Sequence, residues 1–299
     1  MANNRDEFLA RAASPARWRA ADDDGETGDV LCGRDTEAGG TWFGVTRAGS
    51  VAALTNFTEP ASARAARPAA RSRGELVSGF LHAHARDVPT AADVQAYLDR
   101  VGAHADEYGG FNLLVGTAAG VSALGYVTNR GEDKQSGTLL GTGASGGVCA
   151  LSNSTLSTPW PKIGRVEALM RGVLSESATR DALVDGLFRV LADSRGPITT
   201  PAAMRETVRV EPVSLPSTAD RAHFAPAAEA VRPDVPRGWY GTRTASVLLV
   251  TRGAPRRAVL VERDVYALRG DAPPVLLDYG EAQVRAEHER QFEWTLHEN

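Results

Sequence analysis

The chain has 299 residues, a formal net charge of −4 and two cysteines, with 42% hydrophobic and 23% charged residues. This composition is typical of a soluble globular protein, and it excludes a disordered chain, a disulfide scaffold and a four-thiolate metal site. The mild acidity argues against nucleic acid as the main partner. No run of about 18 apolar residues and no apolar leader is visible, so we expect a cytoplasmic protein without a membrane span.

The first 40 residues are polar and rich in Gly and Asp, and the acidic run at Asp22–Asp24 predicts an exposed turn. Further along, paired runs of β-forming residues predict three hairpins, and a last alternating run predicts a final strand. These runs are Trp42–Thr46 with Val51–Phe57, Phe111–Thr117 with Val121–Thr128, Ser246–Thr251 with Ala258–Arg263, and Arg290–Leu296. Val148–Leu151 is a further short strand candidate.

Four segments have the apolar spacing of helices. They lie at 76–84, 90–101, about 164–175 and about 178–193. The second begins with a capping box of Thr90 and Asp93. Residues 195–238 are rich in proline and are expected to be irregular. Because tight turns join neighbouring strands and the helices come in pairs, the order predicts an α+β protein with mostly antiparallel sheets.

Two glycine-rich stretches match known sequence motifs but lack the helix that normally follows each motif. Residues 141–146 spell G-x-G-x-x-G, but prolines rather than a helix follow, so no dinucleotide site is expected. The same stretch gives a G-x-S-x-G match, which leaves a serine hydrolase using Ser145 as the last alternative. No metal and no cofactor are expected, because His82 and His84 face different ways on a helix and the cysteines lack partners at metal-ligand spacing.

Five short stretches are polar where a core element would be apolar. They are Asn4–Glu7, Gly39–Gly44, Leu54–Phe57, Leu151–Asn153 with Pro159–Lys162, and Gly241–Ser246. Two asparagines end predicted strands and one arginine begins another, and buried side chains of these types need hydrogen-bond partners. We therefore expect these stretches to converge on one polar site.

The same stretches resemble the NRDE-motif family, also called the transport and Golgi organisation family. The resemblance runs along essentially the whole chain as motifs in the family's order. They are NRDEF at 4–8, GGTWFGV at 39–45, AALTNF at 52–57, SRGELV at 72–77, YGGFNLLVG at 108–116, LSNSTLSTPWPK at 151–162, YGTRTASVLLV at 240–250 and VER at 261–263. We expect residues 1–299 to form a single domain of this family that lacks the strand preceding NRDE in other members.

The resemblance implies a four-layer αββα sandwich similar to the N-terminal nucleophile hydrolases, whose first Cys, Ser or Thr attacks an amide with its own amine as base. By this resemblance the catalytic residues are Arg5, Asp6, Asn56, Asn153 and Arg243, and the substrate-binding residues are Asn4, Trp42 and Trp160. Arg5 and Asp6 would orient the nucleophile. Asn56 and Asn153 would donate hydrogen bonds to an oxyanion or to the substrate, and Arg243 would place a positive charge near the amine or the substrate. The alternative is a buried hydrogen-bond network that pins the strand ends.

The chain departs from the family at the nucleophile. Family members typically begin Met-Cys, whereas removal of Met1 would here expose Ala2, and Cys32 lies beside Gly33–Asp35 instead. We expect the start to be assigned too far downstream, with an in-frame Met-Cys in the DNA before Met1. The alternative is a protein without the nucleophile.

Two functions follow from the resemblance. The first is an N-terminal nucleophile amidohydrolase whose Cys is absent from this chain. The second is a non-catalytic binding or trafficking protein for haem, acyl-CoA or lipid, with His82, His84 and His104 as haem-ligand candidates outside the motifs. In both cases we expect a small-molecule partner.

Overall fold

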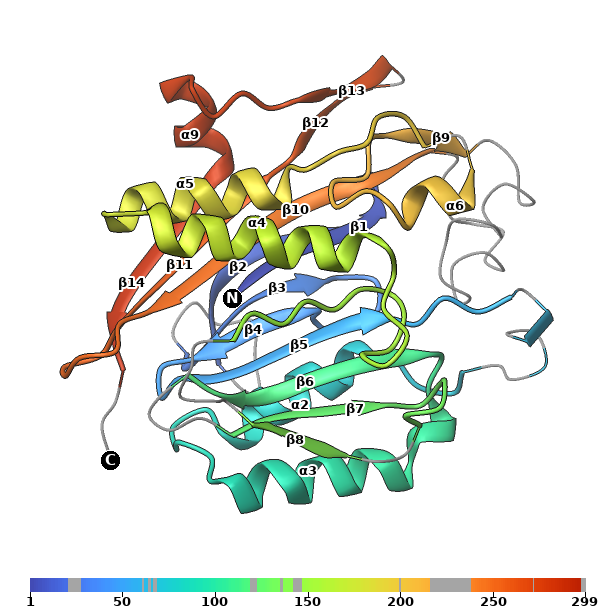
Figure 1. Ribbon diagram of the computed structural model, residues 1–299, viewed down its shortest axis with the longest axis vertical. Helices are drawn as coiled ribbons and strands as arrows, with labels where there is room; N and C mark the ends of the chain where they lie inside the picture. The colour runs from blue at the N-terminus through green and yellow to red at the C-terminus, as the bar shows by residue number, and fades with distance from the viewer. Residues whose placement is uncertain are drawn as a thin grey trace.

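A computed structural model gives the arrangement of the chain (Figure 1). It describes residues 1–20, 28–60, 62–63, 66, 69–118, 123–134, 137–141, 147–198, 200–215, 238–270 and 272–296. The α+β class and the mostly antiparallel sheets predicted from the sequence are confirmed. No helix in these ranges is long and apolar enough to cross a membrane.

The first sheet joins the two ends of the described chain. Its strands run in the order β1-β10-β11-β14, and β9 pairs with the start of β10. They span Ala2–Phe8 (β1), Val213–Leu215 (β9), Gly238–Val250 (β10), Arg257–Asp264 (β11) and Glu289–Thr295 (β14). Every pairing in this sheet is antiparallel.

The second sheet is an antiparallel meander in chain order from β2 to β8. Its strands span Ala13–Arg19 (β2), Val30–Asp35 (β3), Phe43–Thr46 (β4), Ser50–Asn56 (β5), Phe111–Thr117 (β6), Ala123–Thr128 (β7) and Thr138–Gly141 (β8). A separate hairpin is formed by β12 (Tyr266–Arg269) and β13 (Ala272–Leu276), and Figure 1 shows it standing at the top of the molecule with α9 (Ala282–His288).

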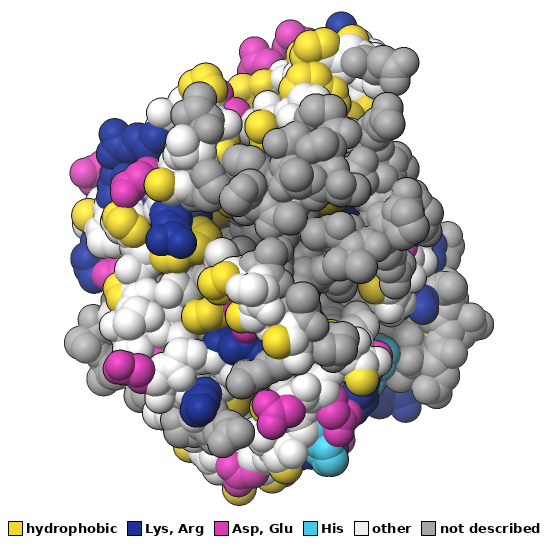
Figure 2. All heavy atoms as spheres, turned by 90° about the vertical axis from the view of Figure 1, so that its right-hand side faces the viewer, with side chains coloured by type: hydrophobic (Ala, Val, Ile, Leu, Met, Phe, Trp, Pro, Cys, Tyr) yellow, Lys and Arg dark blue, Asp and Glu magenta, His cyan; other side chains and the backbone are white. Residues whose placement is uncertain are grey.

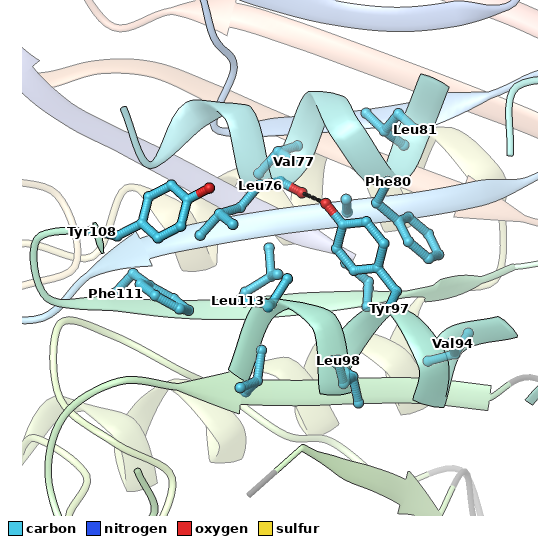
Figure 3. Packing of buried hydrophobic residues seen from close by; sticks show 14 of the residues in the cluster. Leu76, Val77, Phe80, Leu81, Val94, Tyr97, Leu98, Tyr108, Phe111 and Leu113 are labelled. Carbon is cyan, nitrogen blue, oxygen red and sulfur yellow. Dashed lines mark hydrogen bonds between the residues drawn. The ribbon is translucent and has the colours of Figure 1, made fainter. Parts of the chain in front are cut away.

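Helices α2 (Gly74–Ala83) and α3 (Ala91–Ala103) pack on the outer face of the second sheet. Their apolar stripes meet strand residues in one buried cluster, which Figure 3 shows around Phe80 and Leu98. The Tyr97 hydroxyl donates to the Leu76 carbonyl at 2.7 Å, which ties one helix to the other. The predicted capping box of Thr90 and Asp93 starts α3.

A second cluster lies between the two sheets and includes Leu31, Val45, Leu248 and Leu260. A third lies on the other face of the first sheet, where α5 (Arg180–Leu191) contributes Leu187. Beside α5 lies α4 (Lys162–Glu176), and Figure 1 shows both helices above that sheet. The remaining short helices are η1 (Ala105–Glu107) and α6 (Pro201–Met204).

Most predicted elements are confirmed, and one expectation is wrong. Val148–Leu151 forms no strand, and the preceding strand of the sheet is Thr138–Gly141. The first 40 residues, for which the sequence predicted no strand, contain β1, β2 and β3. Their polar side chains find partners inside the protein, so the strands lack the apolar alternation that a sequence search relies on. The run Asp22–Asp24 and Ser145 lie outside the described residues.

Candidate functional site

Several strand ends meet at one end of the molecule. Figure 1 shows β1 and β5 ending on the right-hand side, where β10 begins. The register agrees, because Phe8 at the end of β1 pairs with Tyr240 near the start of β10. Figure 2 looks onto this end, where Lys and Arg side chains are interspersed with Asp and Glu among the coloured residues. The predicted motif residues of these strands therefore lie in the same region.

A β-bulge determines where Arg243 points. Arg5 pairs with Thr244 whereas Asp6 pairs with Thr242, so Arg243 is an extra residue in β10. Such an extra residue breaks the strict alternation of faces. The Arg243 Nη1 donates to the carbonyl oxygen of Arg11, on the side of the sheet to which Arg5 also points.

Arg5 reaches from the first sheet to the second. Its Nη2 lies 3.3 Å from the Asp35 Oδ2, and its guanidinium lies 4.0 Å from the centroid of the Trp42 ring. The same Asp35 oxygen accepts from the Arg11 Nε at 2.8 Å, and Glu7 lies 3.7 Å from that nitrogen. We call Arg5, Glu7, Arg11, Asp35, Trp42 and Arg243 the strand-end cluster.

The cluster compensates some of its charges better than others. Burial opposes ionisation of Asp35, but the hydrogen bonds from Arg11 and the Ala38 amide outweigh it and hold the pKa of the carboxyl below its usual value. Burial, followed by repulsion from Arg5, lowers the pKa of Arg243. The surroundings of Arg243 therefore make its protonated, positively charged form less favourable than it is in water.

Asp6 lies on the opposite face of β1, apart from Arg5. Its Oδ1 accepts from the Thr242 hydroxyl at 2.6 Å, and burial raises its pKa. Lys162, the first residue of α4, donates to the Thr207 carbonyl at 2.7 Å, and burial lowers its pKa. The expected joint action of Arg5 and Asp6 on one nucleophile stays a prediction, and the two side chains have different neighbours.

The predicted substrate-binding residues lie in three places. Asn4 uses its Nδ2 to bind the carbonyls of Leu191 at 2.9 Å and Val208 at 3.2 Å, which fixes the end of α5 against β1. Trp42 belongs to the strand-end cluster, whereas Trp160 lies with its ring centroid 5.3 Å from the Lys162 Nζ. Asn4 and Trp160 are thus neighbours of the α4–α5 layer.

Asn56 and Asn153 come close to each other through the backbone. Asn56 ends β5, and two residues later the Thr58 amide donates to the Asn153 carbonyl at 2.9 Å. Asn112 in β6 holds the segment that carries Asn153, because its Nδ2 donates to the Ser154 carbonyl at 2.9 Å. The two asparagines therefore sit on a backbone held in place from a neighbouring strand.

Neither cysteine has the setting of an activated thiol. Cys32 is buried and burial raises its pKa, and burial also raises the pKa of the more exposed Cys149. A thiolate is the reactive form, so these environments disfavour nucleophilic attack. Across the described ranges, no group of three or more His, Cys, Asp or Glu side chains could hold a metal ion.

Sequence reasoning missed Arg11, Asp35 and Asn112. Asn112 carried a usable signal, because it stands in an otherwise apolar strand and is fully buried. Arg11 and Asp35 lie in polar stretches, where charged residues are ordinary. Arg11 and Asp35 lie beside Arg5 only because β1 pairs with β10 and the second sheet packs against the first.

A model of the Transport and Golgi organisation 2 family matches residues 1–267. The chain belongs to this family. A Bos taurus relative named Transport and Golgi organization protein 2 homolog is 39% identical over 267 residues, covering 84% of this chain and 81% of the relative. A Mus musculus relative, the Transport and Golgi organization 2 homolog, is 34% identical over 259 residues, with the same two coverages.

The family match includes all the motifs noted in the sequence and ends within β12. Among solved structures, penicillin V acylase from Agrobacterium tumefaciens aligns with 98% of this chain and 86% of its own, at 13% identity and a TM-score of 0.33. A score this low carries no argument about the fold. Family membership therefore rests on the family model and on the two relatives.

Proposed function

We propose that the protein binds a small anionic molecule at the strand-end cluster, within a four-layer αββα frame like that of the N-terminal nucleophile hydrolases. The order of the packing clusters supports the frame, since helices, sheet, sheet and helices follow one another. The pairing of β1 with β10 and of β11 with β14 supports a single domain over residues 1–299.

Arg243 carries the proposal. Its guanidinium binds the neutral carbonyl of Arg11, while burial and Arg5 lower its pKa more than the carboxylates of Asp264, Glu7 and Asp35 raise it. An oxyanion placed against it would compensate that charge and take up further guanidinium hydrogens, which suit carboxylates and phosphates. The family resemblance implies haem, acyl-CoA or lipid as ligands. Haem and acyl-CoA carry such groups, and so do those lipids that have an anionic head group.

Titration with hemin and with palmitoyl-CoA tests the proposal. Arg243→Gln should weaken binding of the true ligand at least tenfold, because a hydrogen bond to a charged group contributes about 1.5–3 kcal/mol. Arg252→Gln, an exposed arginine in the turn after β10, is the matched control and should bind like the wild type. Equal affinities for both variants would contradict the site, and the absence of a haem spectral shift at micromolar protein would remove haem.

Amide hydrolysis is the second candidate, and one observation favours it. Asp6 and Lys162 are buried near the same strand end with pKa values displaced in opposite directions. Displaced pairs of this kind gather at catalytic sites. The raised thiol pKa values of Cys32 and Cys149 leave both cysteines as poor nucleophiles.

Assays with simple anilides, on this chain and on one extended to any upstream Met-Cys, separate the two candidates. Hydrolysis by the extended chain, lost in Lys162→Met but kept in Arg252→Gln, would establish the enzyme. Hydrolysis that is lost in Ser145→Ala would instead support the serine alternative. If no in-frame Met-Cys precedes Met1 and this chain is inactive, amide hydrolysis is excluded.

A further inference from the structure

A cavity of about 440 Å³ lies on the helix side of the first sheet, between α5 and the segment from Leu276 to Arg285. This volume falls within the range of small-molecule sites in proteins, which is about 300–1,000 Å³. Figure 1 shows α9 and the β12–β13 hairpin above α5. The cavity is therefore formed where this C-terminal segment meets the helix layer.

Part of the cavity wall is apolar. Phe188 and Leu191 of α5 contribute from one side, and Val265 and Leu276 from the other. Leu276 is 48% exposed, which is unusual for a leucine next to a cavity and leaves apolar surface uncovered. An apolar ligand body would cover this surface.

Several charged groups of the wall are already compensated. Arg263 lies 2.6 Å from Glu289 and 3.2 Å from Asp185, and its guanidinium is placed over the Phe188 ring. Asp264 accepts two hydrogen bonds from Arg290, at 2.6 and 2.9 Å. These groups already have partners of opposite charge. Asp278, also in the wall, accepts from the Gly280 amide at 2.8 Å, so an anion must bind on the arginine side of the cavity.

Arg189 on α5 and Arg285 on α9 differ from them. In the described part of the chain neither has a carboxylate within ion-pair distance, and the Arg285 Nε donates to the neutral carbonyl of Tyr279 at 2.5 Å. Each lies in the last turn of its helix. The partial charge of a helix end offsets only about half a unit charge, so both remain exposed cations that are open to an anion entering the cavity.

We propose that this cavity binds a small organic oxyanion, a carboxylate or a phosphate monoester on an apolar body. The oxyanion would lie against Arg189 and Arg285, and the body against Phe188 and Leu276. Guanidinium groups suit this chemistry because they donate in pairs to planar or tetrahedral oxyanions. Arg189, Leu276 and Arg285 stand outside the family's motifs, and the last two lie beyond residue 267, where the family match ends. Asn4, Ala245 and Arg263 of the wall belong to those motifs, whereas no residue of the strand-end cluster lines this cavity.

Calorimetric titration with naphthoate, naphthyl phosphate and naphthylmethanol tests the proposal, because these probes share one body and differ in the head group. At least one of the two anions should bind ten times or more tightly than the neutral alcohol. The tighter anion identifies the head group. Equal binding of the alcohol, or no binding of any probe at millimolar concentration, would overturn the proposal.

Arg189→Gln and Arg285→Gln should each weaken the anion about tenfold and leave the alcohol unchanged, consistent with the loss of one charged hydrogen bond. Both arginines are exposed, so these variants are expected to fold. Arg252→Gln is the control for lost surface charge. Arg243→Gln should leave this cavity intact, so failure here and failure at the strand-end cluster are distinguishable. Unchanged affinity in both cavity variants would contradict the site.

Discussion

The two regions around the second sheet are held together in different ways. Between this sheet and the helices α2 and α3, the buried cluster is almost wholly apolar and includes Phe80, Leu98 and Leu113 at 0% exposure. At the strand-end cluster, Arg5 is 7% exposed and its neighbours are charged. Apolar burial needs only volume and shape, whereas each buried charge needs a particular partner. The helix layer should therefore tolerate exchange of similar residues, and the cluster should not.

The largest effect is expected in the apolar layer. Phe80→Ala would remove a fully buried ring that packs edge-on against Tyr97 at 5.1 Å, and should lower the free energy of unfolding by about 3–5 kcal/mol. Urea denaturation measures the change. Leu169→Ala, at a leucine that is 41% exposed, should cost far less. Similar losses in both variants would mean that the layer is not the main source of stability.

Asp35→Asn tests the charged region. It would leave Arg5 and Arg11 without their shared carboxylate and should lower the unfolding free energy by about 2 kcal/mol. Asp181→Asn is the matched control, because that carboxylate also pairs with an arginine at 3.3 Å but is 85% exposed. Exposed pairs contribute about 0–1 kcal/mol. A cost at Asp35 no greater than at Asp181 would refute the role assigned to the cluster.

The wild type and Asp35→Asn should also differ in how their stability depends on pH. The folded-state pKa of Asp35 lies below its unfolded value, so its contribution is fully present above about pH 4 and is lost as the pH falls through the folded pKa. The stability difference between the wild type and Asp35→Asn should thus be constant near neutrality and shrink below about pH 4. Urea curves at several pH values measure it, and a difference that grows on acidification would contradict the sign.

A smaller effect is expected at the start of α3. Thr90→Ala would remove the hydroxyl that accepts from the Asp93 amide at 3.2 Å and should cost about 1 kcal/mol. Thr36→Ala, at an exposed turn residue, is the control. Circular dichroism during thermal unfolding detects the loss, and an unchanged midpoint would mean that packing alone fixes the helix.

The contrast also explains what could be read from the sequence. The helices with repeating apolar residues, such as Val94 and Leu98 in α3, follow from periodicity because burial imposes it. The strands β1 to β3 do not follow, since their polar side chains are paired with residues distant in the chain. The family motifs single out Arg5 and Asp6 as sequence neighbours, but the two side chains lie on opposite faces of β1 with different partners, because side chains alternate along a strand.

Some motif residues serve packing instead of chemistry. A Cβ on Gly40 would lie 2.6 Å from the Gly74 Cα, so the two glycines let α2 approach the start of β4 backbone to backbone. Both belong to stretches that identified the family, GGTWFGV and SRGELV. Sequence similarity alone cannot separate such a contact from a catalytic role, because both exclude most other residues.

The bulge in β10 has a consequence for insertions and deletions. Arg5 pairs with Thr244 and Asp6 pairs with Thr242, so deletion of the single residue Arg243 would convert the bulge into regular pairing and keep the positions between Gly238 and Thr242 on their present faces. Tyr240 would keep its edge-on contact with Phe8, and Thr242 its hydrogen bond to Asp6. The bulge therefore adds one arginine to the strand-end cluster without changing the packing of the strand start, and this position can gain or lose one residue in evolution or design, whereas a deletion elsewhere between Gly238 and Thr242 would shift side chains to the other face.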